Sequence, residues 1–180
     1  VGKQKKELKD YIQKKLNKFE NKYFYGKEFQ VTKSLKNKFE IKIDGKKYLY
    51  TQPSLNGKHQ EENASISIYF AKIMKKLGYK LNTKEINAAI KQTIWPGRLE
   101  IINYKNKQII LDGSHNIDGA DKLNEFLKTK RIKPIVLFGM LNSKKASLFL
   151  SKIKKRVSKV LAIKIPDEKN SFKTKQIIEI

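Results

Sequence analysis

The stretch Ile110-Leu111-Asp112-Gly113-Ser114-His115-Asn116-Ile117-Asp118-Gly119 decides the fold of this chain. Its apolar start predicts a strand, and the polar residues and glycines that follow predict a turn into a helix. Ligands of open α/β sheets collect at the carboxyl ends of strands, where a helix N-terminus also offers unpaired N–H groups. The stretch is therefore a candidate site for a polar ligand. The local pattern leaves one alternative open, in which Asp112 and Asn116 only cap the helix and the glycines make the turn.

The residues around this stretch alternate between short apolar runs and amphipathic segments. We predict strands at residues 99–102, 108–111, 135–138 and 160–163, and helices at residues 120–127 and 143–157. A further helix is predicted to begin at Lys173. Alternation at these lengths indicates βαβ crossovers, so the predicted fold class is α/β with a mostly parallel sheet.

The first half of the chain has a different pattern. An amphipathic helix is predicted at residues 3–19. Residues 39–50 alternate with period two around Asp44-Gly45, a turn signal, and so predict a β-hairpin. Two helices follow, one from near Glu62 and one that opens with a capping box at residues 82–85.

Trp95-Pro96-Gly97 interrupts the helical pattern, because proline and glycine together favour a rigid, tight turn. Beyond this point the predicted strands and helices alternate, as in an α/β domain. We therefore place a domain boundary near residues 95–98, with one domain at residues 1–95 and the other at residues 96–180.

Composition limits the classes of function. The chain has 41 Lys and Arg against 17 Asp and Glu, a formal net charge of +24. Such a charge suits nucleic-acid binding, but only three of the basic residues are arginines, which nucleic-acid readers use for bidentate contacts. The lysines are spread over the polar faces of the predicted helices, so we interpret the charge as compositional bias on a solvated surface.

Cysteine is absent, which excludes disulfides, thiolate zinc sites and a cysteine nucleophile. The sequence has no apolar run of about 18 residues and no secretory leader pattern. We therefore expect a cytoplasmic protein without a membrane partner. The chain begins at Val1 inside a helical pattern, so we expect it to be part of a longer protein.

Two further segments hold candidate binding residues. Arg98 follows Trp95-Pro96-Gly97, and a guanidinium there can fork onto a phosphate. The alternative for Arg98 is a surface ion pair with Glu100. Gln60 and Asn63 lie in a polar segment that leads into a helix, and their amides can donate and accept at once, as recognition of an adenine edge requires. The alternative for Asn63 is helix capping.

Three other kinds of site do not fit the central stretch. Its acidic residues and Asn116 lack the spacing of a calcium loop. Ser114 lacks the flanking glycines of a nucleophile elbow. His115 and His59 are far apart in the sequence with no thiolate, so no metal site is predicted.

Three motifs occur along the chain in the order Leu55-Asn56-Gly57-Lys58-His59-Gln60-Glu61-Glu62-Asn63-Ala64, Trp95-Pro96-Gly97-Arg98-Leu99-Glu100, and Ile110-Leu111-Asp112-Gly113-Ser114-His115-Asn116. Together they resemble the signature of the folylpolyglutamate synthase and dihydrofolate synthase family of the Mur ligase superfamily. Val136-Leu137-Phe138-Gly139-Met140 also resembles the next strand and loop of that family. The resemblance implies the end of a P-loop-type ATPase central domain at residues 1–95 and a Rossmann-like C-terminal domain at residues 96–180.

The resemblance implies roles for five residues. Asn63 would contact the adenine of ATP, and Gln60 would shape that loop. Arg98 would reach the nucleotide phosphates, and Asp112 would hold the ribose or the nucleotide-binding loop. His115 would orient the site, so Arg98 and His115 are the catalytic candidates.

A few positions depart from the family pattern. Ser114 stands where alanine is frequent, and Ile117 stands where proline usually follows the His-Asn pair. Residues 141–145 lack the Asp-Lys-Asp sequence that the family often has, which leaves Lys144 without an assigned role.

The reaction that the resemblance implies is ATP-dependent amide formation between L-glutamate and a carboxylate of dihydropteroate or a reduced folate, through an acyl phosphate. ATP and Mg²⁺ are the implied cofactors, and we expect a monomer without a nucleic-acid partner. No G-x-x-x-x-G-K-[ST] phosphate loop occurs in the sequence. We therefore expect that loop, the main magnesium ligands and the folate pocket outside these residues, and the chain alone to be inactive.

Alternatives to this interpretation stay open. A Mur-type ligase that extends a peptidoglycan precursor would share the architecture and the nucleotide site. A basic nucleic-acid-binding module would explain the charge but would leave the three ordered motifs unexplained. A noncatalytic relative would keep the fold.

Overall fold

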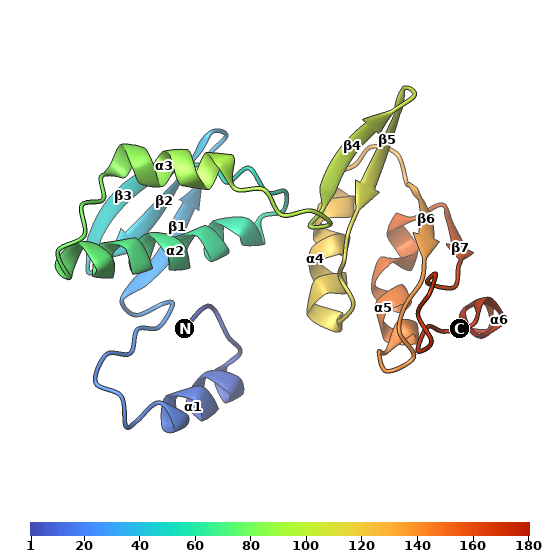
Figure 1. Ribbon diagram of the computed structural model, residues 1–180, viewed down its shortest axis with the longest axis horizontal. Coiled ribbons are helices and arrows are strands. Elements are labelled where there is room, and N and C mark those ends of the chain that lie inside the picture. The colour runs from blue at the N-terminus through green and yellow to red at the C-terminus, as the bar shows by residue number, and fades with distance from the viewer. The chain divides into compact units, whose positions relative to one another are not determined.

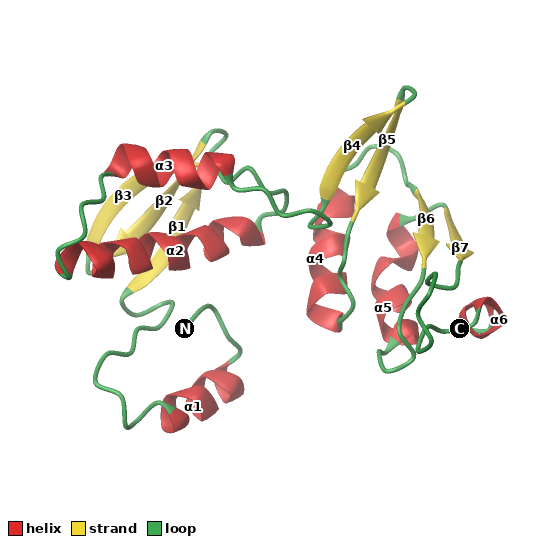
Figure 2. Cartoon of the chain, in the orientation of Figure 1, coloured by secondary structure: helices red, strands yellow, loops and turns green.

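A computed structural model describes all 180 residues of the chain (Figure 1). The chain divides into two compact units, Val1–Trp95 and Pro96–Ile180. Helices and strands occur in both units, so the predicted α/β class is confirmed (Figure 2). The assignment of the units to a central ATPase domain and a Rossmann-like ligase domain stays a prediction.

The first unit is built on an antiparallel sheet in the order β1-β2-β3. Its strands are β1 (Phe29–Ser34), β2 (Lys38–Ile43) and β3 (Lys46–Thr51). The hairpin predicted at residues 39–50 is confirmed, because Ile43 pairs with Lys46 across a turn in which Asp44 and Gly45 have φ angles of 45° and 84°. Alternate residues of β2 are buried, as a half-covered sheet requires.

Three helices complete this unit: α1 (Lys6–Lys15), α2 (His59–Lys76) and α3 (Thr83–Gln92). Helices α2 and α3 contact the sheet, α2 at β1 and β2 and α3 at β3 (Figure 1). The predicted capping box of α3 is confirmed, since the Asn82 side chain accepts from Glu85 N and Glu85 Oε2 accepts from Asn82 N, both at 2.9 Å. The buried core between helices and sheet comprises Phe29, Phe39, Ile41, Ile43, Tyr50, Ile68, Tyr69 and Ile90.

The second unit begins with an antiparallel pair, β4 (Glu100–Tyr104) and β5 (Lys107–Leu111). Helix α4 (Ile117–Lys128) follows and leads to β6 (Ile135–Phe138). Helix α5 (Ala146–Ile153) and a short 3₁₀ turn (Lys154–Arg156) then connect to β7 (Lys159–Ala162), which pairs with β6 in parallel. The chain ends with α6 (Thr174–Ile178).

One part of the fold prediction needs correction. The strands before and after Lys105-Asn106 were expected in a mostly parallel sheet, but β4 and β5 form an antiparallel hairpin. Lys105 and Asn106 have φ angles of 44° and 61°, the left-handed pair that a two-residue hairpin turn requires. Only β6 and β7 form the predicted parallel arrangement, with α5 as the crossover.

The core of the second unit lies where α4 and α5 pack beside each other and against the strands. Its buried residues are Ala120, Leu127, Phe138, Met140, Ala146, Phe149, Ile153, Val157 and Ile177. The polar residues of the central motif lie between the end of β5 at Leu111 and the start of α4 at Ile117. In neither unit does a helix have the length and apolar content needed to cross a membrane.

Candidate functional site

Gln60 and Asn63 lie one turn apart in the first two turns of α2. Asn63 Nδ2 donates to Gln60 Oε1 at 2.9 Å, and Gln60 Nε2 lies 3.2 Å from His59 Nε2. Because Gln60 is only 7% exposed, these contacts fix its amide, and Gln60 in turn holds the amide of the exposed Asn63. The capping alternative for Asn63 is wrong, since α2 begins at His59 and its N-cap position is Lys58.

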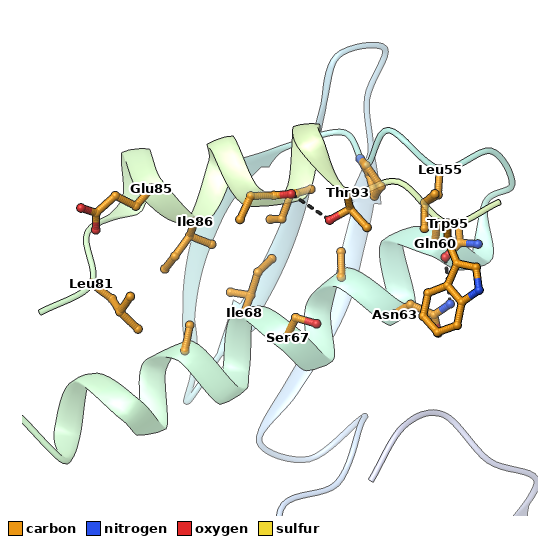
Figure 3. Close-up of a pocket in the computed structure, with 15 residues that line it drawn as sticks. Leu55, Gln60, Asn63, Ser67, Ile68, Leu81, Glu85, Ile86, Thr93 and Trp95 are labelled. Carbon is orange, nitrogen blue, oxygen red and sulfur yellow. Dashed lines mark hydrogen bonds between the residues drawn. The ribbon is translucent and has the colours of Figure 1, made fainter. Parts of the chain in front are cut away.

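The two amides line a cavity of about 570 Å³ in the first unit (Figure 3). Its wall consists mainly of apolar side chains from α2 and α3, and its lining residues are Pro53, Leu55, Gln60, Asn63, Ala64, Ser67, Ile68, Ala71, Leu81, Glu85, Ile86, Ala89, Ile90, Thr93 and Trp95. Gln60, Asn63 and Trp95 lie together at one end (Figure 3). An apolar cavity with a few polar groups at one end is the usual form of a small-molecule site, and it suits a flat ring with polar edges.

The sequence favours Trp95 as a packing anchor rather than a stacking platform, and the structure differs from this expectation. The indole is 60% exposed and lines the cavity beside the two amides. An exposed aromatic face at the rim of a cavity can stack on a planar ligand. No local sequence signal marks this role, because the exposure of Trp95 depends on which segments meet its side chain.

Two hydrogen bonds join the Arg98 motif to the Asp112 motif, one between backbone groups and one to the Asp112 side chain. Gly113 N donates to Gly97 O at 2.7 Å, and Leu99 N donates to Asp112 Oδ2 at 3.1 Å. Glu100 Oε2 accepts from Gly97 N at 2.8 Å. The loop that carries Arg98 is thus fastened to the loop that follows β5.

The Arg98 loop has an unusual backbone. Gly97 and Leu99, on either side of Arg98, have φ angles of 68° and 48°. Glycine adopts this left-handed region freely, but for leucine the conformation costs about 1–2 kcal/mol. Burial of the Leu99 side chain, which is 3% exposed, and its bond to Asp112 offset that cost. The backbone position from which the exposed Arg98 side chain extends is therefore fixed.

The alternative interpretation, in which Asp112 caps α4, is wrong. Its Oδ2 accepts from Leu99 N and its Oδ1 accepts from Ser114 N, both at 3.1 Å. One carboxylate thus serves two loops. The capping alternative is correct for Asn116, whose Oδ1 accepts from Gly119 N at 2.8 Å.

His115 is exposed in the loop between β5 and α4. Its Nδ1 lies 2.9 Å from Gly113 O. A carbonyl oxygen only accepts, so Nδ1 carries the hydrogen and Nε2 keeps its lone pair while the ring is neutral. The ring is oriented by the same loop that Asp112 holds.

The structure gathers the predicted site residues into two groups. Gln60 and Asn63 are together at the cavity of the first unit, and Arg98, Asp112 and His115 are together in the joined loops of the second. Glu100 was not predicted as a backbone acceptor, because its sequence position beside Arg98 favoured an ion pair. Nowhere in the chain do three or more His, Cys, Asp or Glu side chains form a group that could hold a metal ion.

No family model matches the chain. Among curated proteins, it is 33% identical over 93 residues to the dihydrofolate synthase/folylpolyglutamate synthase of Bacillus subtilis, covering 51% of this chain and 21% of that protein. It is 32% identical over 114 residues to the folylpolyglutamate synthase of Lacticaseibacillus casei, covering 62% of this chain and 26% of that protein. The chain thus matches about a fifth to a quarter of the length of these relatives.

Solved structures give the same result over nearly the whole chain. Thermotoga maritima folylpolyglutamate synthase matches 99% of this chain with a TM-score of 0.74 and 27% identity, over 43% of its own length. Mycobacterium tuberculosis folylpolyglutamate synthase, solved with ADP and AMPPCP, matches 98% of this chain and 41% of its own with a TM-score of 0.82; at 18% identity it supports the fold alone. The motifs, the curated relatives and the solved structures therefore agree: the proteins that this chain is similar to are folylpolyglutamate and dihydrofolate synthases.

Proposed function

We propose that the protein carrying these 180 residues is an ATP-dependent ligase that joins L-glutamate to a carboxylate of dihydropteroate or a reduced folate. The observation that carries the proposal is the fastening of the Arg98 loop to the loop that bears Asp112 and His115. This arrangement offers a cation, a carboxylate and an imidazole in two joined loops next to the start of α4. Curated relatives of 32–33% identity carry the names of enzymes with these two activities.

The cavity of the first unit is proposed to take the adenine of ATP. A purine has a flat apolar body and a polar edge, which corresponds to the apolar wall and to the amides of Gln60 and Asn63. With one Nδ2 hydrogen given to Gln60, Asn63 keeps its Oδ1 and a second N–H for the adenine edge. Trp95 would lie against the ring.

The second unit is proposed to serve the phosphates and the ribose. Arg98 would neutralise charge on the phosphate oxygens, and Asp112 would hold the ribose or keep the nucleotide-binding loop in place. His115, with its Nδ1 held by Gly113 O, would present Nε2 to the site. A guanidinium and fixed dipoles lower the barrier most when they face charge that develops in the transition state.

The reaction follows from the weakness of a carboxylate as an electrophile. A carboxylate oxygen of the folate attacks the γ-phosphorus of ATP, ADP leaves, and an acyl phosphate forms. The amine of glutamate then attacks the acyl carbon, loses a proton, and expels inorganic phosphate as the amide forms. Arg98 contributes to the first step by charge neutralisation and positioning.

Mg²⁺ is the proposed metal, and these residues contain no group of three or more metal-ligating side chains. Magnesium commonly binds through substrate phosphates and one or two carboxylates, so it would arrive with the nucleotide. The expectations of a monomer in the cytoplasm, without nucleic-acid or membrane partners, stay predictions.

Phosphate release tests the proposal. The protein should release phosphate from ATP only when glutamate and either dihydropteroate or tetrahydrofolate are present, and the substrate that works tells the two folate activities apart. Arg98→Ala and Asp112→Ala should abolish turnover. Arg131→Ala, a change of another exposed arginine in the same unit, should leave it intact. A folded protein that binds ATP but turns over neither folate would overturn the proposal and lead to trials with peptidoglycan precursors.

A further inference from the structure

The backbone on both sides of Arg98 adopts an unfavourable conformation that hydrogen bonds stabilise. The residues before and after it, Gly97 and Leu99, both have left-handed φ angles. Three backbone groups beside Arg98 are bonded: Gly97 N to Glu100, Gly97 O to Gly113 N, and Leu99 N to Asp112. Each of these bonds limits where the guanidinium can go.

Glu100 differs from Gly113 and Asp112, the other two hydrogen-bond partners of this loop, because it lies on the strand that the loop leads into. It is the first residue of β4, and its side chain turns back to accept from Gly97 N at 2.8 Å through Oε2. The β4–β5 hairpin anchors Glu100 from the other side, since Glu100 pairs with Leu111 directly before Asp112. Glu100 therefore ties the turn at Gly97, just before Arg98, to strand β4.

We propose that Glu100 is a positioning residue for Arg98: its carboxylate oxygen fixes the left-handed Gly97 turn and so sets the direction in which the guanidinium leaves the loop. This inference rests on the proposed function, because it concerns the residue assigned to the phosphates. What matters at Glu100 is an acceptor oxygen at the right distance, and its charge is secondary. If Glu100 instead acted through an ion pair with Arg98, its charge would be essential and the exact position of its oxygen would matter less.

Two conservative variants separate these requirements. Glu100→Gln removes the charge but keeps a carbonyl oxygen at the same distance, so the bond to Gly97 N survives. Glu100→Asp keeps the charge but shortens the side chain by one methylene, so the oxygen no longer reaches Gly97 N. ATP affinity should stay within about twofold of the parent in Glu100→Gln. In Glu100→Asp it should fall about tenfold, because Gly97 N loses its acceptor and the turn beside Arg98 is no longer held.

A double-mutant cycle with Arg98→Ala shows whether Glu100 acts through that arginine. The probes are MgATP and adenosine, titrated into the protein that carries these residues. Glu100→Ala should weaken MgATP binding about tenfold in the parent but less than about twofold in the Arg98→Ala background. Binding of adenosine, which has no phosphate, should not change. Glu125→Ala is the matched control, because it removes an exposed carboxylate from α4 in the same unit.

Each outcome decides between distinct explanations. Equal losses in both backgrounds, or a loss of adenosine binding, would mean that Glu100 only stabilises the fold, and the inference would be wrong. Weak binding in Glu100→Gln with normal binding in Glu100→Asp would mean that charge decides. If Arg98→Ala itself left MgATP affinity unchanged, the proposed function would fail at its phosphate site. If Glu100→Ala did not fold, the contrast between the Gln and Asp variants would still decide.

Discussion

Gly119 is the residue where the site leaves least room for a side chain. It is the third residue of α4, and its N–H donates to the Asn116 cap. A Cβ built on Gly119 would lie 2.9 Å from both Cβ and Oγ of Ser114 and 3.1 Å from Asn116 Oδ1. The Ser114 hydroxyl can rotate away, but its Cβ cannot, so Gly119→Ala must displace the loop that holds Asp112 and His115.

The magnitude is a balance of two effects. Alanine in a helix gains up to about 1 kcal/mol over glycine. Overpacking at a contact this short costs about 1–3 kcal/mol. We expect a net loss of about 1 kcal/mol, which lowers the melting temperature of a unit of this size by about 4–8 °C.

Thermal unfolding followed by circular dichroism measures this effect in four proteins: the parent, Gly119→Ala, Ser114→Gly and the double variant. Ser114→Gly removes the two nearest atoms that the new Cβ would meet, Cβ and Oγ of Ser114, so the double variant should be more stable than Gly119→Ala alone. An interaction free energy of about 1 kcal/mol or more should appear in the cycle. A Gly119→Ala protein as stable as the parent, or one that Ser114→Gly does not rescue, would refute this reasoning.

Three further predictions concern the first unit. Asn63→Ala should raise the dissociation constant for ATP about tenfold, measured by titration, whereas Asn103→Ala at an exposed position of β4 should not. Asn82→Ala removes the acceptor for Glu85 N and should lower the free energy of unfolding by about 1 kcal/mol in urea, while Asn82→Asp should stay near the parent. Burial, followed by the nearby Asp44 carboxylate, raises the pKa of Tyr69 to about 12 from 10.0. The associated stability is therefore complete below pH 10 and is lost as the pH rises to about 12, and Tyr69→Phe should remove that loss in unfolding curves.

The elements that were predictable from sequence are those whose signals are local. The period-two pattern around Asp44-Gly45 fixed the β2–β3 hairpin, because the turn residues and the buried face agree. The capping box of α3 was equally readable, because two side chains three residues apart satisfy each other's backbone. Such pairs need no knowledge of the rest of the fold.

Features that depend on distant partners were not predictable. Lys105-Asn106 is not one of the usual turn pairs, so the antiparallel pairing of β4 with β5 gave only a weak signal. The role of Glu100 depends on a left-handed turn at Gly97, which the sequence marks only as a possible turn. Asp112 reads as a helix cap until its bond to Leu99 N, 13 residues earlier, is known.

The candidate site was predictable in its residues and not in its contacts. Their amides mark Gln60 and Asn63 as binding residues in the sequence, and the structure adds that Gln60 is buried and holds Asn63 at the cavity. Trp95 was expected to be covered, but its side chain is 60% exposed. Burial of a single side chain depends on which segments meet it, and spacing in the sequence does not record that.

The most direct test of the central claim is to follow an oxygen atom through the reaction. A folate substrate labelled with ¹⁸O in its carboxylate is incubated with ATP, glutamate and the protein, and the products are analysed by mass spectrometry. Formation of an acyl phosphate predicts a folate that has gained one glutamate and inorganic phosphate that carries one ¹⁸O. Phosphate without the label, or no glutamate addition by a protein that hydrolyses ATP, would contradict the account.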